Sequence, residues 1–214
     1  MARLATRPTP QVPELEDIAA ALERGPLGMV PNSFATMAHR PDLARAFVML
    51  TGVVMGPGRV DPGLKQLVAF VVSSSAGSAY CQAHTAMVAD ELGIDPTKLA
   101  QIGEFDASPQ YSPPERAALR VAVGAGQVPN AVTDEQFAEL REHFDSEQIV
   151  ELVGVIATFG FLNRWNETMA TTLEASPLAF AQEHLAVRGW RGDKHVEAEP
   201  APVANEAAVL ADEP

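Results

Sequence analysis

The segment GSAYCQAHTAMVADELG, which runs from Gly77 to Gly93, decides the expected fold. Gly77 follows a long apolar run, and a glycine in such a place can end a helix in the left-handed conformation. Ser78 is a favourable N-cap for the next helix, and Gly93 is a favourable end for it. The segment therefore predicts two consecutive helices joined at Gly77, with Cys81 in the first turn of the second helix.

Cys81 and His84 are the candidate catalytic pair of this segment. Cys81 is the only cysteine of the 214 residues, and His84 lies three residues later on the same helix face. The helix dipole and the free N–H groups of a first turn stabilise a thiolate, so we expect a lowered thiol pKa. His84 can take the thiol proton or pass a proton to a substrate. The alternative is a structural pair, because a single cysteine is often a small buried hydrophobe.

Composition excludes several classes of protein. The net charge of −13 argues against a nucleic acid or an anionic membrane as partner, since both require basic surface. A single cysteine rules out an intramolecular disulfide and fits a reducing compartment, so we expect a cytoplasmic protein. The N-terminal residues show no apolar signal region, and no uninterrupted apolar run approaches the length of a membrane span.

Helix signals recur along the rest of the chain, and no segment has the pattern of a strand. We expect an all-α fold in which residues 1–12 form an extended arm, residues 13–195 form a single helical domain, and residues 196–214 form a disordered acidic tail. The strongest start signals are Asp61-Pro62, the capping boxes at Ser112 and Thr133, and Asp145 or Ser146.

A weak internal repeat appears when the sequence is shifted by 85 residues. The matched pairs are Gln66 with Glu151, Ser78 with Asn163, Tyr80 with Trp165, and Cys81 with Asn166. If the repeat is real, the fold consists of two related helical hairpins about a pseudo-two-fold axis, and Glu151, Asn163 and Asn166 face a site like that of the first copy. Chance similarity is the alternative.

Three segments resemble the carboxymuconolactone decarboxylase / alkylhydroperoxidase-like family. The family signature is a Glu, then Cys-x-x-Cys, then a His, and Tyr80-Cys81-Gln82-Ala83-His84-Thr85 matches the second Cys and the His. The segments VPNSFATMAHRPDL at residues 30–43 and FLNRWN at residues 161–166 resemble the N-terminal region and the long, peroxidase-related branch of the family. The resemblance runs from about residue 30 to residue 195 and implies a helical bundle that forms a homo-oligomer.

The chain departs from this signature at two positions. Ser78 stands where the first Cys is expected, so it cannot resolve a sulfenic acid as a disulfide. Gln66 stands where the proton-relay Glu is expected, and Glu151 is a candidate substitute unless it is a solvated or intersubunit carboxylate. The candidate catalytic residues are thus Cys81, His84, Glu151 and Gln66, and the candidate substrate-binding residues are Ser78, Tyr80, Asn163, Arg164, Trp165 and Asn166.

Three functions are compatible with these residues. The first is a one-cysteine peroxidase, in which Cys81 attacks a small-molecule peroxide and an external thiol regenerates it. The second is a cofactor-free decarboxylase, lyase or isomerase acting on an organic acid, with His84 as acid/base and Arg164 holding a carboxylate. The third is a non-catalytic helical oligomer. We expect no cofactor and no metal, because the other histidines show no ligand spacing to Cys81 and His84.

Overall fold

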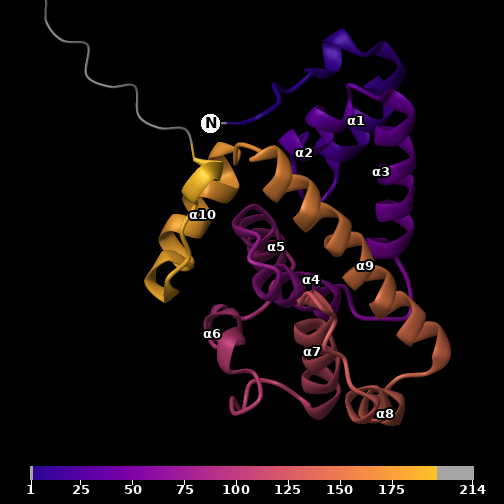
Figure 1. Cartoon of the computed structure of the whole chain (residues 1–214), viewed down its shortest axis with the longest axis vertical. Helices are drawn as coiled ribbons and strands as arrows, with labels where there is room; N and C mark the ends of the chain where they lie inside the picture. The colour runs from indigo at the N-terminus through magenta and orange to yellow at the C-terminus, as the bar shows by residue number, and fades with distance from the viewer. Residues whose placement is uncertain (1, 197–214) are drawn as a thin grey trace, which may run out of the picture.

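The computed structural model describes residues 2–196, and within that range the chain is built from helices without any strand (Figure 1). The all-α prediction is therefore confirmed. Helix α4 (Pro62–Ser75) is the centre of the main core, where Leu67, Val68 and Val72 are almost fully buried. It packs against α5 (Ala79–Glu91), α7 (Pro113–Gly126) and α9 (Ser146–Met169).

The turn between α4 and α5 forms as the sequence predicts. Gly77 adopts a φ of +71°, which an L side chain rarely adopts, so α4 ends there and the chain reverses into α5. Asp61 accepts a hydrogen bond from the Leu64 N–H at the start of α4, and Gly93 has a φ of +80° just after α5. This hairpin brings the first turn of α5 against the middle of the molecule.

The other helices surround this centre. The N-terminal layer consists of α1 (Glu16–Arg24), α2 (Asn32–Met37) and α3 (Pro41–Met55), and α6 (Pro96–Ala100), α8 (Asp134–His143) and α10 (Ala175–His184) complete the α-helices. Short 3-10 helices lie at Thr9–Gln11, Pro13–Leu15, Ile102–Glu104, Ala186–Arg188 and Asp193–His195. The capping boxes predicted at Ser112 and Thr133 are present, and Asp145 caps α9.

The second half of the chain does not repeat the α4–α5 hairpin. Both matched segments, at Glu151 and at Asn166, lie on the single 24-residue helix α9, which crosses Figure 1 diagonally. The position that corresponds to Gly77 is Leu162, and a leucine does not readily take the positive φ that such a turn requires. The prediction of two helical-hairpin halves is therefore wrong in its second half, although Asn166 and Cys81, which the repeat equates, are in contact.

The N-terminal arm packs onto the domain. The Arg3 N–H donates to the Met169 carbonyl, and the Arg7 N–H donates to the Ala35 carbonyl, so residues 2–8 lie along α9 and α2 without regular structure before the short helix Thr9–Gln11. A second, smaller core joins this arm to α1, α2 and α3 through Val12, Leu15, Ile18, Phe34, Met37, Ala38 and Ala44. The predicted acidic tail lies, from residue 197 onward, outside the described residues.

None of the helices in residues 2–196 is long and apolar enough to cross a membrane.

Candidate active site around Cys81

Cys81 lies in the first turn of α5 and is only 2% exposed. Ser78 occupies the N-cap position by its backbone, but its side chain makes no capping hydrogen bond. The thiol instead meets α9, because the Asn166 Nδ2 group lies 3.4 Å from Cys81 Sγ. Asn166 is fully buried, so this contact is shielded from solvent.

Burial controls the acidity of the thiol. It raises the pKa of Cys81 to about 11, although the Ser78 hydroxyl and the Asn166 amide act in the opposite direction; the Glu167 carboxylate raises it further. A helix N-terminus contributes about 0.3–1 kcal/mol, less than one pKa unit, and burial outweighs it. The sequence-based expectation of a lowered thiol pKa is therefore wrong for the isolated chain.

His84 is held by a carboxylate from another helix. Its Nε2 lies 2.7 Å from Glu174 Oε2, and its ring packs against the Tyr80 ring at 4.6 Å between centroids. The Tyr80 hydroxyl donates to Glu174 Oε1 at 2.8 Å, and the Asn32 N–H donates to the same oxygen. Glu174 therefore joins α5, α2 and the start of α10 in one buried network.

The charges within this network shift the pKa values of its members in opposite directions. Burial by itself would raise the pKa of Glu174, but the hydrogen bond and the charge of His84, together with the Asn32 N–H and the Tyr80 hydroxyl, lower it. Burial and the neighbouring Glu174 charge raise the pKa of Tyr80 well above its ordinary value. The network therefore holds an ionised Glu174 beside a neutral Tyr80, an arrangement that can hold and pass on a proton.

Sequence reasoning missed Glu174. The helix α10 that it precedes was not predicted, and its partner His84 is 90 residues away in the chain. One signal was present: Glu174 is the only charged residue between Glu167 and Glu183. A lone carboxylate in such a stretch is a candidate for a buried partner.

A second pair, formed by the buried His195 and the partly exposed Glu167, lies near Tyr80. His195 Nε2 is 2.9 Å from Glu167 Oε1, and its Nδ1 is 2.7 Å from the Thr171 carbonyl oxygen. Although burial alone would raise it, the hydrogen bonds from His195 and Lys194 lower the pKa of Glu167 to about 2. Glu167 is close enough to Cys81 to affect the thiol, and the His195 ring is 5.9 Å from that of Tyr80.

Glu151 and Gln66 lie elsewhere. Glu151 forms an ion pair with Lys65, and its Oε2 accepts a hydrogen bond from the Arg59 N–H at 2.9 Å. It precedes Asn166 on α9 by fifteen residues, which corresponds to about 22 Å along the helix axis. Gln66 is half-buried on α4, next to Lys65. The structure does not bring Glu151 to the thiol.

The predicted substrate-binding residues separate into two groups. Ser78, Tyr80, Asn163 and Asn166 are all buried, the first two at the start of α5 and the last two on α9, and Asn166 contacts Cys81. Arg164 is exposed and donates to the Gly160 carbonyl of its own helix, and Trp165 donates through Nε1 to Thr36 Oγ1 of α2. Within residues 2–196, no group of three or more potential metal ligands occurs.

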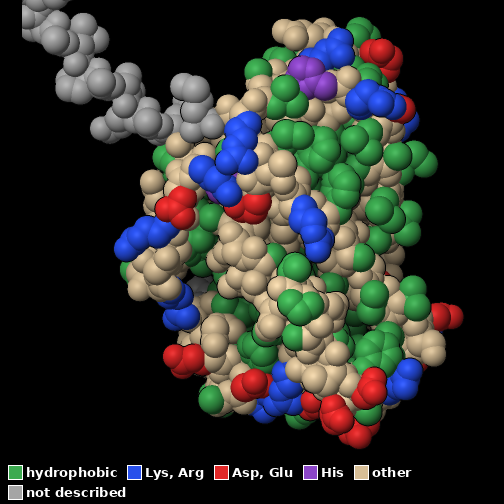
Figure 2. Space-filling model, in the orientation of Figure 1, with side chains coloured by type: hydrophobic (Ala, Val, Ile, Leu, Met, Phe, Trp, Pro, Cys, Tyr) green, Lys and Arg blue, Asp and Glu red, His purple; other side chains and the backbone are tan. Residues whose placement is uncertain are grey.

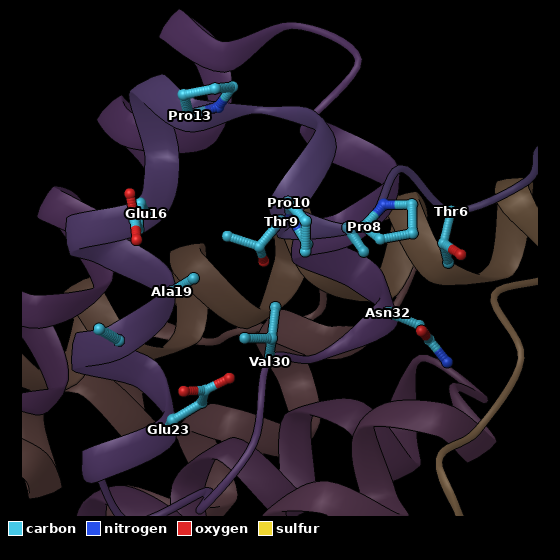
Figure 3. A pocket seen from close by; sticks show the side chains of 12 residues that line it. Thr6, Pro8, Thr9, Pro10, Pro13, Glu16, Ala19, Glu23, Val30 and Asn32 are labelled. Carbon is cyan, nitrogen blue, oxygen red and sulfur yellow. The ribbon is translucent and has the colours of Figure 1, made fainter.

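A surface pocket adjoins this site (Figure 3). It has a volume of about 680 Å³ and lies between the N-terminal arm, α1 and the segment that leads into α2. Asn32 lines it, and the same residue donates from its N–H to Glu174 and from Nδ2 to the Thr172 carbonyl oxygen. Asn32 thus connects the wall of the pocket to the Glu174 network.

Comparisons with known proteins agree with this architecture. Residues 41–124 match the model of the carboxymuconolactone decarboxylase family. A crystal structure of the debrominase Bmp8, in a cysteine-to-alanine variant bound to 2,3,4-tribromopyrrole, superposes with a TM-score of 0.80 at 33% identity, covering 86% of this chain and 99% of that chain. The apo form of Bmp8 gives 0.78 at 34% identity, covering 83% and 95%.

Two further relatives are more distant. The uncharacterized protein YnjA of Escherichia coli is 29% identical over 110 residues, which is 51% of this chain and 60% of YnjA, so the match spans less than two thirds of that relative. An uncharacterized peroxidase-related protein of Ralstonia eutropha, with an alkylhydroperoxidase core, has a TM-score of 0.73 at 23% identity over 84% of this chain and 95% of its own, which shows the fold alone.

The family model and the relative that is 33% identical along nearly its whole length agree, and this chain belongs to the carboxymuconolactone decarboxylase family, with the all-α fold of alkylhydroperoxidase-like proteins.

Proposed function

We propose that the protein is a thiol-dependent reductase that uses Cys81 to remove halogen from a small aromatic ring. The observation that carries this proposal is the placement of the only cysteine of the chain beside Asn166 and the Tyr80–Glu174–His84 network. The similarity to a debrominase over 99% of that chain supports it. Because no second cysteine exists, the reducing equivalents come from an external thiol.

The chemistry balances with two external thiols. The Cys81 sulfur attacks the halogen, the electron pair of the carbon–halogen bond returns to the ring carbon, and that carbon takes a proton. This leaves a dehalogenated ring and a sulfenyl halide at Cys81. A first external thiol displaces halide and forms a mixed disulfide, and a second releases the Cys81 thiol. The sum converts one carbon–halogen bond and two thiols into a carbon–hydrogen bond, a disulfide and a hydrogen halide.

The buried network fits the proton movements of the first step. The Cys81 thiol loses one proton and the ring carbon gains one, so the step needs a group that carries a proton rather than a net acid or base. Tyr80 precedes Cys81 directly, and its hydroxyl shares Glu174 with His84. We propose that His84, whose Nε2 is hydrogen-bonded to the ionised Glu174 carboxylate, is the proton carrier.

A thiol-dependent peroxidase is the second candidate. The same sulfur can attack a peroxide oxygen, which releases an alcohol and leaves a sulfenic acid for two external thiols to reduce. The single buried cysteine and the alkylhydroperoxidase-like fold favour it. Organic-acid decarboxylation has less support, because Arg164, the expected carboxylate ligand, donates to its own helix at the surface.

One experiment separates the candidates. The purified protein is incubated with dithiothreitol and either 2,3,4-tribromopyrrole or cumene hydroperoxide, and bromide release and peroxide consumption are measured. We expect bromide release that Cys81→Ser abolishes and that Thr168→Leu, an exposed change on α9, leaves unchanged. Peroxide consumption that depends on Cys81 without bromide release would favour the peroxidase. Neither activity, or activity without Cys81, would overturn both.

A further inference from the structure

Asn163 is a buried residue whose side-chain amide has no hydrogen-bond partner among the described residues. Its side chain is on α9, the residue is 3% exposed, and neither its Oδ1 nor its Nδ2 has a hydrogen-bond partner within residues 2–196. A buried amide without partners is unfavourable, because it loses its hydrogen bonds to water and gains none. Native proteins therefore pair such groups with a ligand or with water.

The position of Asn163 ties this unpaired amide to the thiol. Asn166 lies three residues later on the same face of α9, and its Nδ2 contacts Cys81 Sγ while its Oδ1 is unpaired within the described chain. Side chains three residues apart on a helix have Cβ atoms about 5–6 Å apart. The unpaired amide of Asn163 and the unpaired Oδ1 of Asn166 thus lie on the face of α9 that carries the contact to Cys81.

Other asparagines of this chain hydrogen-bond to the backbone through their side chains. Asn32 donates from its side chain to the Thr172 carbonyl oxygen, and Asn130 accepts from the Val132 N–H through Oδ1. Asn163 makes no such bond to the described backbone, although it is more deeply buried than either. Its oxygen and its nitrogen therefore both lack a partner among residues 2–196, whichever way the amide is placed.

We propose that Asn163 is a specificity-determining residue that accepts a hydrogen bond from a ring N–H or O–H, so that the substrates are halogenated pyrrole-like or phenol-like rings. This inference rests on the proposed dehalogenation at Cys81. It also fits that chemistry, because a ring with an N–H or O–H can move that proton to the carbon that bears the halogen. The heteroatom then becomes an acceptor, and the free Nδ2 of Asn163 is the matching donor.

The test measures binding without turnover. Cys81→Ala protein is titrated by calorimetry with 2,3,4-tribromopyrrole and with 2,3,4-tribromothiophene, a ring of similar size without the N–H. We expect the pyrrole to bind more tightly by about tenfold or more. Adding Asn163→Leu to Cys81→Ala should remove this preference, by weakening the pyrrole and not the thiophene. Adding Thr168→Leu, an exposed change on the same helix, should leave both affinities unchanged.

Thermal stability provides the second readout. Leucine has a similar shape without unpaired polar atoms, so Asn163→Leu should melt at the same temperature as the parent or higher. Equal affinity for the two rings, no binding of either, or a preference unchanged by Asn163→Leu would overturn the proposal. A clear drop in melting temperature would also overturn it, since it would show a structural role. The proposed function is tested separately: it would fail if the protein that retains Cys81 released no bromide.

Discussion

Glu174 Oε2 lies 2.7 Å from His84 Nε2, so the histidine of the signature is held by a carboxylate from the start of α10 rather than by the Cys81 thiol. Glu174 is mostly buried, and it also accepts hydrogen bonds from Tyr80 and Asn32. In this chain, which has Gln66 where the family signature has a relay Glu, Glu174 is the buried carboxylate nearest to His84 in the hydrogen-bond network.

Replacing Glu174 by glutamine should reduce turnover while the fold persists. Glutamine keeps an acceptor for Tyr80 and the Asn32 N–H, but it removes the negative charge of the carboxylate that contacts His84 Nε2. We expect bromide release, or peroxide reduction, to fall by about 100-fold, the scale of a lost general acid/base. The rate of Cys81 alkylation in the absence of substrate serves as control and should not change. Full activity of Glu174→Gln would show that the pair of Glu174 and His84 takes no part in the mechanism.

Cys81 should react slowly with alkylating reagents at neutral pH. Burial raises the pKa of Cys81 to about 11, so iodoacetamide labelling of the folded protein should increase with pH through this range. His84→Ala should leave the pH profile unchanged, because His84 faces Glu174. Asn166→Leu should move the profile to higher pH, because the Asn166 amide lowers the thiol pKa. A labelling midpoint near the free-thiol value of about 8.5 would contradict this account.

Acid should destabilise the protein through Glu167. The pKa of Glu167 is lowered to about 2 from an unperturbed value of 4.5, so its stabilisation is complete above about pH 4.5 and is lost as the pH falls toward 2. The side chain is 24% exposed, and after partial screening the effect is about 2–3 kcal/mol. Urea unfolding between pH 5 and pH 2 measures it. In Glu167→Gln, whose side chain does not titrate, the free energy of unfolding should depend less steeply on pH. An unchanged slope would show that Glu167 is not the source of the acid sensitivity.

The ion pair between Lys65 and Glu151 should be structural. Lys65 is fully buried and also donates to the carbonyl oxygens of Val54 and Gly56, at 2.9 and 2.8 Å. Lys65→Met would leave Glu151 without its charge partner and should cost about 3–5 kcal/mol in the free energy of unfolding.

Two variants control for this interpretation. The double variant Lys65→Met with Glu151→Leu should recover much of that loss, because no uncompensated charge remains. Glu151→Gln should retain turnover at Cys81, since Glu151 lies about 22 Å from Asn166 along α9. Loss of turnover in a well-folded Glu151→Gln protein would support the catalytic role that the internal repeat suggested.

We propose that α3 carries the face through which two copies of the chain associate. Met49 and Val53 of α3 are 66% and 78% exposed, and Figure 2 shows hydrophobic side chains gathered over this side of the molecule. A groove of about 360 Å³ between α3 and α9, with Leu50 and Phe161 among its walls, continues the apolar surface. Contiguous apolar surface of this kind marks interaction sites.

Sedimentation at micromolar concentration tests this face. The parent protein should sediment as an oligomer, and Met49→Glu with Val53→Glu should sediment as a monomer with unchanged helicity. Val187→Glu, at an exposed apolar residue outside this face, is the matched control and should not change the oligomer. A monomeric parent, or an oligomer that tolerates both glutamates, would exclude α3 as the interface.

Helix ends that carry local signals could be predicted from the sequence. Asp61-Pro62, Gly77, Ser112 and Thr133 specify helix ends through their own backbone preferences, and the structure has helix ends at each of them. The position of Cys81 in the first turn of α5 followed from Gly77 and Ser78 in the same way. Such signals depend on a few neighbouring residues, so they can be recognised without knowledge of the fold.

The chemistry around the thiol depends on contacts between segments that are distant in the chain. The spacing of His84 in the sequence allows it to face either Cys81 or another group. The packing of α10 brings Glu174 to it. The thiol pKa depended on how completely α5 is covered, which raised it instead of lowering it. Glu151 matched a catalytic position in the repeat, but the continuous helix α9 carried it to Lys65. Burial and long-range pairing depend on packing between distant segments, and local sequence preferences do not encode them.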